Sequence, residues 1–306
     1  LEFDKVRQIL AGYTSFSGGE DLARSLTPTT DILEARQWQA ETSEAVRLLD
    51  SHSSVTIGGA RDGRRSVDNA ERGFTLLAED LLDIRSTLAA GRNLRRNLLK
   101  AEDSFPRLAE IAELIEECPG LVSAISQTLD ERGEVLDSAS SKLAKLRQEL
   151  RVVHGRIQEK LQRILQSSQN QYLQDPLVSM RSGRYVVPLR ADAKGRIKGI
   201  VHDQSGSGAT LWIEPLATVE LNNEYRGLQI AEQDEIQRIL AELSRQVAEQ
   251  GDSIRRVVAR MAELDLIFAR ARYASMIKGV APDFVDWRAF QAPRPPKHAN
   301  ELAKWT

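Results

Sequence analysis

Apolar residues in two long stretches of the chain recur in alternating steps of three and four. The upstream set is Leu136, Ala139, Leu143, Leu146, Leu150, Val153 and Ile157. The downstream set is Ile236, Leu240, Leu243, Val247, Ile254, Val257, Met261, Leu264 and Phe268, and polar Gln250 interrupts it. Such steps average about 3.5 residues, the repeat of a coiled-coil seam. We expect two long helices that pair antiparallel as a coiled coil, with Leu150 opposite residues 243–254. Two helices of an ordinary bundle are the alternative.

Residues 175–215, between these stretches, contain the residue types of β-strands. The expected strands are the runs Arg184–Leu189, Ile197–Val201 and Ala209–Ile213, bounded by the turns Ser182-Gly183, Lys194-Gly195 and Ser205–Gly208. Pro188 cannot donate to a ladder, so the first run is predicted to be an edge strand. The pattern indicates a small β module carried between two helical arms.

The first third of the chain has helical periodicity throughout. The expected helices cover residues 1–13, 20–26, 31–50, 67–72, 75–90, 94–99, 105–117 and 121–128, with a break at residues 15–19. Residues 52–65 contain three glycines and are interpreted as a plain loop, because no helix with a phosphate-binding lysine follows. This third is predicted to form an all-α core.

The composition restricts the partners and the compartment. Lys and Arg number 42 and Asp and Glu 44, a net charge of −2, so any attraction to nucleic acid must be local. Cys118 is the only cysteine, which excludes an intramolecular disulfide and fits a reducing cytoplasm. No run of about 18 apolar residues occurs, so we expect no membrane partner and a cytoplasmic location.

Positive charge is concentrated in the β module. From Pro176 to Pro215 the bases are Arg181, Arg184, Arg190, Lys194, Arg196 and Lys198, and the acids are Asp192, Asp203 and Glu214, a sum of 6 − 3 = +3. Lys194, Arg196 and Lys198 alternate across a turn and into a strand, so they can share one face. Such clusters bind phosphate backbones without reading bases. We therefore predict that these six bases bind nucleic acid; a solvated hairpin tip is the alternative.

Catalytic chemistry has little support in the sequence. No G-x-x-x-x-G-K-[ST] motif occurs, and the four histidines are scattered singly, without metal-ligand spacing. His202 and Asp203 are adjacent, so on a strand they would point to opposite faces, and we interpret them as part of a structural turn. Asn222 and Asn223 are expected to cap or anchor the base of the arm and not to read bases. The chain is thus expected to be a binding module without a catalytic, cofactor or metal site, and not an enzyme.

Several segments resemble one family in the same order along nearly the whole chain. They are LEFDKVRQILAGY (1–13), GEVLDSASSKLAKLRQEL (133–150), RSGRYVVPLRA (181–191), GIVHDQSGSGATLWIEP (199–215), VELNNEYR (219–226) and AELDLIFARARYA (262–274). Together they resemble the second (type-2) subfamily of bacterial MutS-related proteins.

The resemblance implies a mainly α fold, a helical core domain with a long antiparallel coiled-coil arm that carries a small β clamp. The implied division is a helical core at 1–132, an ascending lever helix at 133–175, the clamp at 176–215, a descending lever helix at 216–279, and a linker at 280–306 toward a missing ATPase domain.

The resemblance also implies a function. In the family the clamp touches the DNA backbone, and the full-length protein is a homodimer that binds ATP and Mg in the missing domain and carries a small nuclease-like domain. The implied role is to bind branched or duplex DNA and to restrain homologous recombination. Rescue of collided ribosomes, through a clamp that binds ribosomal RNA, and a purely structural arm that transmits nucleotide state are the alternatives.

Overall fold

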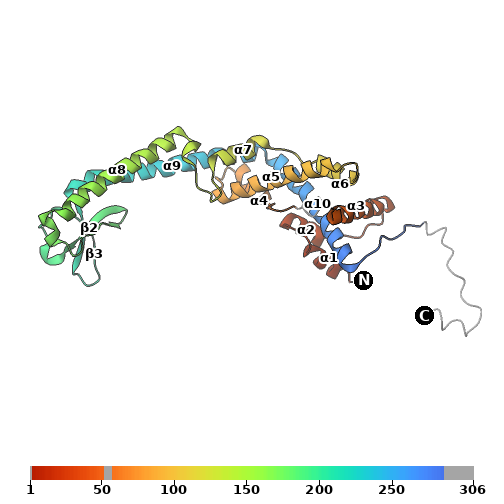
Figure 1. Cartoon of the computed structure of the whole chain (residues 1–306), viewed down its shortest axis with the longest axis horizontal. Coiled ribbons are helices and arrows are strands. Elements are labelled where there is room, and N and C mark those ends of the chain that lie inside the picture. Colours follow the sequence, from red (N-terminus) through yellow and green to blue (C-terminus); the bar gives the residue numbers. More distant parts are fainter. Residues whose placement is uncertain (1, 52–56, 286–306) are drawn as a thin grey trace, which may run out of the picture. The chain divides into compact units, whose positions relative to one another are not determined.

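The computed structural model describes residues 2–51 and 57–285, and these form the mainly α fold with a small antiparallel sheet that the sequence predicts (Figure 1). Part of the expected loop (52–56) and of the expected linker (286–306), with His52 and His298, lies outside the described residues. The helices are α1 Phe3–Ala11, α2 Ser17–Ser25, α3 Ile32–Ser51, α4 Arg64–Glu71, α5 Ala78–Lys100, α6 Pro106–Glu113, α7 Pro119–Thr128, α8 Ser141–Gln166, α9 Val219–Glu249 and α10 Gly251–Ile277.

The chain divides into two compact units. Unit 1 comprises Leu1–Asp62, Ser86–Glu117 and Arg255–Thr306, and unit 2 comprises Gly63–Arg85 and Cys118–Ile254, each as far as its residues are described. The two expected lever helices and the expected clamp contribute to unit 2, except that the residues after Ile254 belong to unit 1.

In unit 1, Gly19 and Gly91 lie inside helices, where they permit close contacts. The buried carboxylate of Asp265 on α10 accepts the backbone amides of Ser15 at 2.8 Å and Phe16 at 3.2 Å, which fixes the start of α2. A Cβ on Gly19 would collide with this carboxylate, so Gly19 lies inside α2 and not in the expected break. Helix α5 continues through Gly91, although the sequence predicts two separate helices there. A Cβ at Gly91 would lie only 3.1 Å from Val257, so the glycine allows α5 to pack closely at this point.

In unit 2, α8 and α9 run antiparallel. Ser140, directly before α8, donates to Glu235, Arg147 contacts Glu232, and Lys160 donates to the carbonyl of Ala217, so the partner's number falls as the residue number rises. The buried residues of α8 are Leu143, Leu146, Val153, Ile157, Leu161 and Leu165, which include four of the seven predicted seam positions. The side chain of Ser140 caps α8 by accepting the amide of Leu143 at 3.0 Å.

The register of this pair differs from the expected one. Arg147 lies against Glu232, so Leu150, three residues further along, faces the region near Gln229 and not residues 243–254. The second half of α9 packs instead against α4 and α7, where Ser244 accepts the backbone amide of Leu76 at 2.8 Å. The descending helix also breaks at Gln250, the one polar position in its seam, and the seam residues Val257, Met261, Leu264 and Phe268 that follow are buried in unit 1.

A four-stranded antiparallel sheet in the order β1-β2-β4-β3 follows α8. Its strands are β1 Ser179–Arg181, β2 Arg184–Arg190, β3 Gly199–Gln204 and β4 Thr210–Pro215. The sequence predicts three of them and misses β1, which is only three residues long. Ser182 and Gly183 both have positive φ (51° and 74°), the geometry of the two-residue hairpin turn that joins β1 to β2.

Strand β2 is internal, contrary to the prediction from Pro188. β1 pairs with β2 only as far as Val186, so no strand lies beside Pro188 on that side. The carbonyl of Pro188 accepts the amide of Gln174 at 2.8 Å. Because both backbone polar atoms of a residue in an antiparallel strand face the same side, the missing N–H points away from β4 and removes no bond from that ladder.

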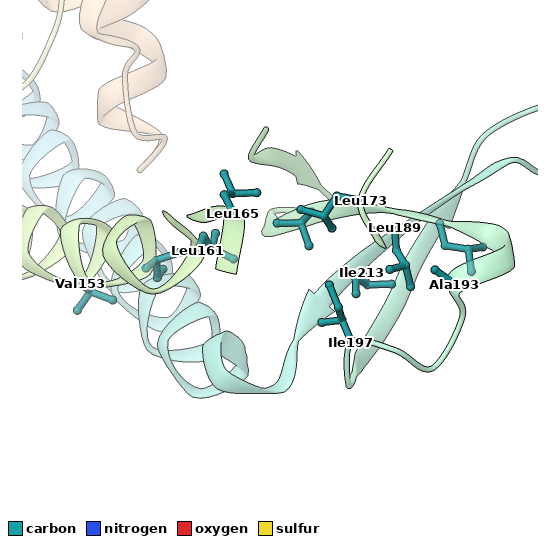
Figure 2. Packing of buried hydrophobic residues seen from close by; sticks show 11 residues of the cluster. Val153, Leu161, Leu165, Leu173, Leu189, Ala193, Ile197 and Ile213 are labelled. Carbon is teal, nitrogen blue, oxygen red and sulfur yellow. The ribbon is translucent and has the colours of Figure 1, made fainter. Parts of the chain in front are cut away.

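The sheet and the ends of the two helices share one core (Figure 2). It contains Val153, Ile157, Leu161, Leu165, Leu173, Val187, Leu189, Ala193, Ile197, Leu211 and Ile213. Three rings beside it join the elements: His154 of α8 lies 5.2 Å from Tyr185 of β2, which lies 5.6 Å from Tyr225 of α9. Burial raises the pKa of Tyr185 to about 12. The module is therefore fixed to the end of the helix pair by apolar contacts.

Candidate nucleic-acid interface

Three of the six predicted bases are paired with the three acids of the module. The side chain of Arg190 lies 2.5 Å from Asp192, and this hydrogen bond lowers the pKa of Asp192 below its ordinary value. Arg181 lies 3.3 Å from Asp203, and Arg184 lies 2.8 Å from Glu214. Each acid thus offsets one arginine.

Glu214 is the centre of a buried polar cluster. Its side chain is fully buried in β4, and its two oxygens receive the guanidinium of Arg184 and the Nε2 of His202, the latter at 2.6 Å. Arg184 also donates to Asn223 at 2.6 Å. A buried carboxylate needs such partners because water cannot solvate it. Arg184 is therefore held inside the module by its own fold.

A β-bulge places His202 in this cluster. Val201 pairs with Ile213 and Asp203 pairs with Trp212, so His202 is one extra residue in β3. The sequence predicts a turn at His202 and Asp203, whereas both lie within the strand. The neighbouring Asn222 accepts the amide of Tyr185 at 3.1 Å and donates to its carbonyl at 3.2 Å, so it joins the first turn of α9 to β2.

Arg181 has a second partner besides Asp203. Its guanidinium carbon lies 4.1 Å from the centre of the Trp212 ring, and its Nη1 donates to Ser179 at 2.8 Å. A cation over the face of an indole ring is attracted by the ring's quadrupole. The side chain is half-buried in this arrangement.

The remaining three bases lie together on one loop, Lys194–Lys198, which joins β2 to β3. Lys194, Arg196 and Lys198 are all exposed, and within the described part of the chain no acid pairs with any of them. Arg196 lies 5.8 Å from the ring of Tyr172. We name these three residues the loop cations. They carry the whole +3 that the sequence assigns to the module.

Buried core residues fix the position of the loop, and its cations do not lie on a strand with alternating side chains. Lys198 precedes β3, so the expected alternation into a strand does not occur. Instead, the buried residues Ala193 and Ile197 lie in the same cluster as Leu189 and Ile213, far from Val153 (Figure 2). The carbonyl of Lys198 accepts the amide of Leu216 at 3.0 Å. The loop cations therefore extend from a fixed backbone.

The sequence reasoning missed the pairing of charges. Counting charges gives the correct sum, but the partner of Glu214 depends on the β2–β4 register and on the bulge in β3. A signal was present for one pair: Arg190 and Asp192 are two residues apart at the end of a strand.

Other kinds of site have no counterpart in the described residues. Within 2–51 and 57–285, no three His, Cys, Asp or Glu side chains come together in a way that could hold a metal ion. In the same ranges no helix has the length and apolar character that crossing a bilayer requires.

Comparison with known proteins gives a consistent result. The chain is 42% identical over 286 residues to the endonuclease MutS2 of Geobacillus sp. strain WCH70, a match that covers 92% of this chain and 36% of the relative. It is 40% identical to endonuclease MutS2 of Symbiobacterium thermophilum, with 93% and 36% covered, and 41% identical to that of Thermomicrobium roseum, with 94% and 36% covered. No family model matches the chain.

These three relatives share one name, and the similarity extends over more than nine-tenths of this chain. The chain spans about a third of the length of the curated relatives that it matches. Over more than nine-tenths of its length, this chain is therefore similar to part of the endonuclease MutS2 sequences.

Proposed function

We propose that this chain is a nucleic-acid-binding part of a longer MutS2-like protein, and that the loop cations of the β module bind the phosphate backbone of branched or duplex DNA. The carrying observation is the distribution of charge in the module. All three acids between Pro176 and Pro215 are occupied by arginines, which leaves Lys194, Arg196 and Lys198 exposed on one short loop. Phosphate contacts of this kind fix position without reading sequence.

In this proposal the role of Arg184 changes from a DNA ligand to a structural residue. Arg181 and Arg190 remain at the margin of the surface, where bound phosphates would compete with Asp203 and Asp192. The Arg190–Asp192 pair is exposed, and exposed ion pairs contribute about 0–1 kcal/mol, so a polyanion could exchange that pair at little cost.

The relatives are named endonucleases, and that activity is assigned here to parts of the longer protein outside these 306 residues. The same holds for ATP and Mg binding and for the homodimer that the family resemblance implies. The chain would then bind DNA in the cytoplasm while other parts carry out the chemistry that restrains recombination. A ribosome-binding role uses the same loop cations and is an outcome of the test below.

The test is the charge-reversed variant Lys194→Glu/Arg196→Glu/Lys198→Glu of the 306-residue chain. Binding to labelled branched and linear duplex DNA is measured between about 50 and 200 mM salt. Each lost phosphate contact lowers the slope of log K against log salt by roughly 0.9, so we expect a loss of about 2.7 from the three cations. The thermal unfolding midpoint should hardly change, because the three side chains are exposed.

The matched control reverses three exposed cations on α8, Lys145→Glu/Arg151→Glu/Arg163→Glu, which changes the net charge equally. Each of these cations already faces an acid: Glu149, Asp137 and Glu159 respectively. Equal DNA affinity and equal slopes for parent and loop variant would contradict the proposal. If the loop variant loses ribosome co-sedimentation but keeps DNA binding, the target is the ribosome.

A further inference from the structure

A second concentration of positive charge lies on α5, in unit 1. Residues 91–100 read GRNLRRNLLK and contain four bases and no acid. Arg92, Arg96 and Lys100 are exposed and follow one another at intervals of four, so they lie on one face of the helix, and Arg95 flanks them. The first half of the helix has the opposite character, with Glu79, Asp80 and Asp83.

The helix dipole does not account for this cluster. Cations interact favourably with the last turn of a helix, and only Lys100 lies there. Arg92, Arg95 and Arg96 lie further back, where the dipole effect has faded. Like charges at intervals of four also destabilise a helix by about 0.2–0.5 kcal/mol per pair. The arrangement therefore costs stability in the free protein, and a bound anion would remove that cost.

The cluster surrounds a recess of about 450 Å³ lined by Arg92, Arg95, Arg96, Leu99, Lys100 and Glu117. Glu117 is the only acid in the lining, and it contacts Arg95 at 3.0 Å. The Nε of Arg95 is buried and has no hydrogen-bond partner among the described residues. Arg96 has one neutral partner, the side-chain oxygen of Asn93 at 3.1 Å. Most of the donors around the recess therefore remain available.

We infer that this face of α5 is a second phosphate-binding surface, which contacts the backbone of a nucleic acid independently of the β module. Four cations within nine residues match a run of phosphates, and the absence of aromatic side chains from the recess argues against base stacking. The inference rests on the proposed class of partner, nucleic acid, but not on the loop cations.

The test uses the 306-residue chain with Arg92→Glu/Arg96→Glu and labelled duplex DNA over the same salt range. Neither residue contacts an acid in the described structure, so their loss removes no ion pair. We expect the salt slope to fall by about 1.8 and the affinity near 0.1 M salt to fall roughly tenfold or more. The matched control Lys5→Glu/Arg24→Glu changes the net charge equally within unit 1, at exposed cations already paired with Glu2 and Glu20. It should leave the slope unchanged.

A neutral variant, Arg92→Gln/Arg96→Gln, distinguishes a loss of DNA contacts from a loss of folding. Glutamine and arginine have similar helix propensities, so relief of the like-charge repulsion should keep or raise the thermal midpoint while DNA binding still weakens. A folded neutral variant that binds DNA with the parent's affinity and slope overturns the inference. The loop-cation variant is assayed in parallel. If only the α5 variants weaken binding, this inference stands and the proposed function of the loop fails. If only the loop-cation variant weakens binding, the proposed function stands and this inference fails.

Discussion

Arg184 and Arg190 stand at the two ends of one strand, and their surroundings give them different roles. Arg184 reaches the fully buried carboxylate of Glu214 and the side chain of Asn223. Arg190 is exposed and contacts Asp192, two residues away. Because Glu214 is buried away from water, its carboxylate depends on Arg184 for a partner. Arg190 and Asp192 are exposed, so water can replace either partner of that pair.

Arg184→Ala should therefore destabilise the protein by about 3–5 kcal/mol, because it leaves a buried carboxylate without its guanidinium partner. Arg190→Ala should change the free energy of unfolding by no more than about 0.5 kcal/mol. Urea unfolding of both variants, followed by far-UV circular dichroism, measures the difference. Adding Glu214→Gln to Arg184→Ala should recover much of the loss; equal effects of the two arginines would show that Glu214 does not depend on Arg184.

Glu235 on α9 gives a pH-dependent prediction. Hydrogen bonds from Arg238 first, and then from Ser140 and Lys142, outweigh desolvation and lower the pKa of Glu235 to about 2. The folded-state pKa is below the unfolded value, so the unfolded chain binds the proton first as the pH falls. The stabilisation is complete above about pH 4.5 and is lost as the pH falls toward 2.

The comparison is between the parent and Glu235→Gln in urea unfolding across that pH range. The variant should be less stable at neutral pH, and the difference in unfolding free energy should shrink below about pH 4.5. Glu149→Gln, which changes a partly exposed carboxylate 3.8 Å from Lys145, is the control and should have little effect. A difference that stays constant down to acidic pH would contradict the stabilising role of the Glu235 carboxylate.

At the scale of elements, α8 shows how a periodic pattern becomes a buried face. Its seam residues Val153 and Ile157 belong to the core shared with the sheet, together with Leu161 and Leu165, which follow at steps of four. The pattern predicts which face is buried, but a second helix and a sheet both cover it. A seam therefore predicts burial more securely than it predicts the partner or the register.

Adjacent valines on α8 provide a test of that face. Val153 is 3% exposed, whereas Val152 is 48% exposed. Val153→Asp should cost several kcal/mol of stability, because it places a charge in an apolar core without a partner. Val152→Asp introduces the same residue at the neighbouring helical position and should cost little. Chemical denaturation of the two variants decides the matter, and comparable losses would show that the face is not buried in solution.

At the scale of the whole molecule, the sequence predicts the mainly α fold, three of the four strands and the excess charge of the β module. The sequence does not predict the short strand β1 or the partners of the charged side chains. Ser179–Arg181 is too short for a periodic signal, and the partner of Glu214 depends on a bulge that only the folded sheet defines. Gly91 looks like a helix break but permits close packing with Val257. Gln250 interrupts the seam at the residue where α9 ends and before α10 begins, so a single polar seam position marks a helix break that the periodicity alone does not predict.

The attachment of the β module has a consequence for protein engineering and evolution. The chain reaches the module from the end of α8 and returns at the start of α9, and these points are adjacent because Lys160 donates to the carbonyl of Ala217 at 2.9 Å. A segment whose ends lie side by side can be exchanged, enlarged or shortened without rerouting the rest of the chain. Because the module's core includes Val153 through Leu165, such a graft must carry the last turns of α8 with it. The transferable unit is the β module together with the last turns of α8, and new binding specificities could arise by replacing that unit as a whole.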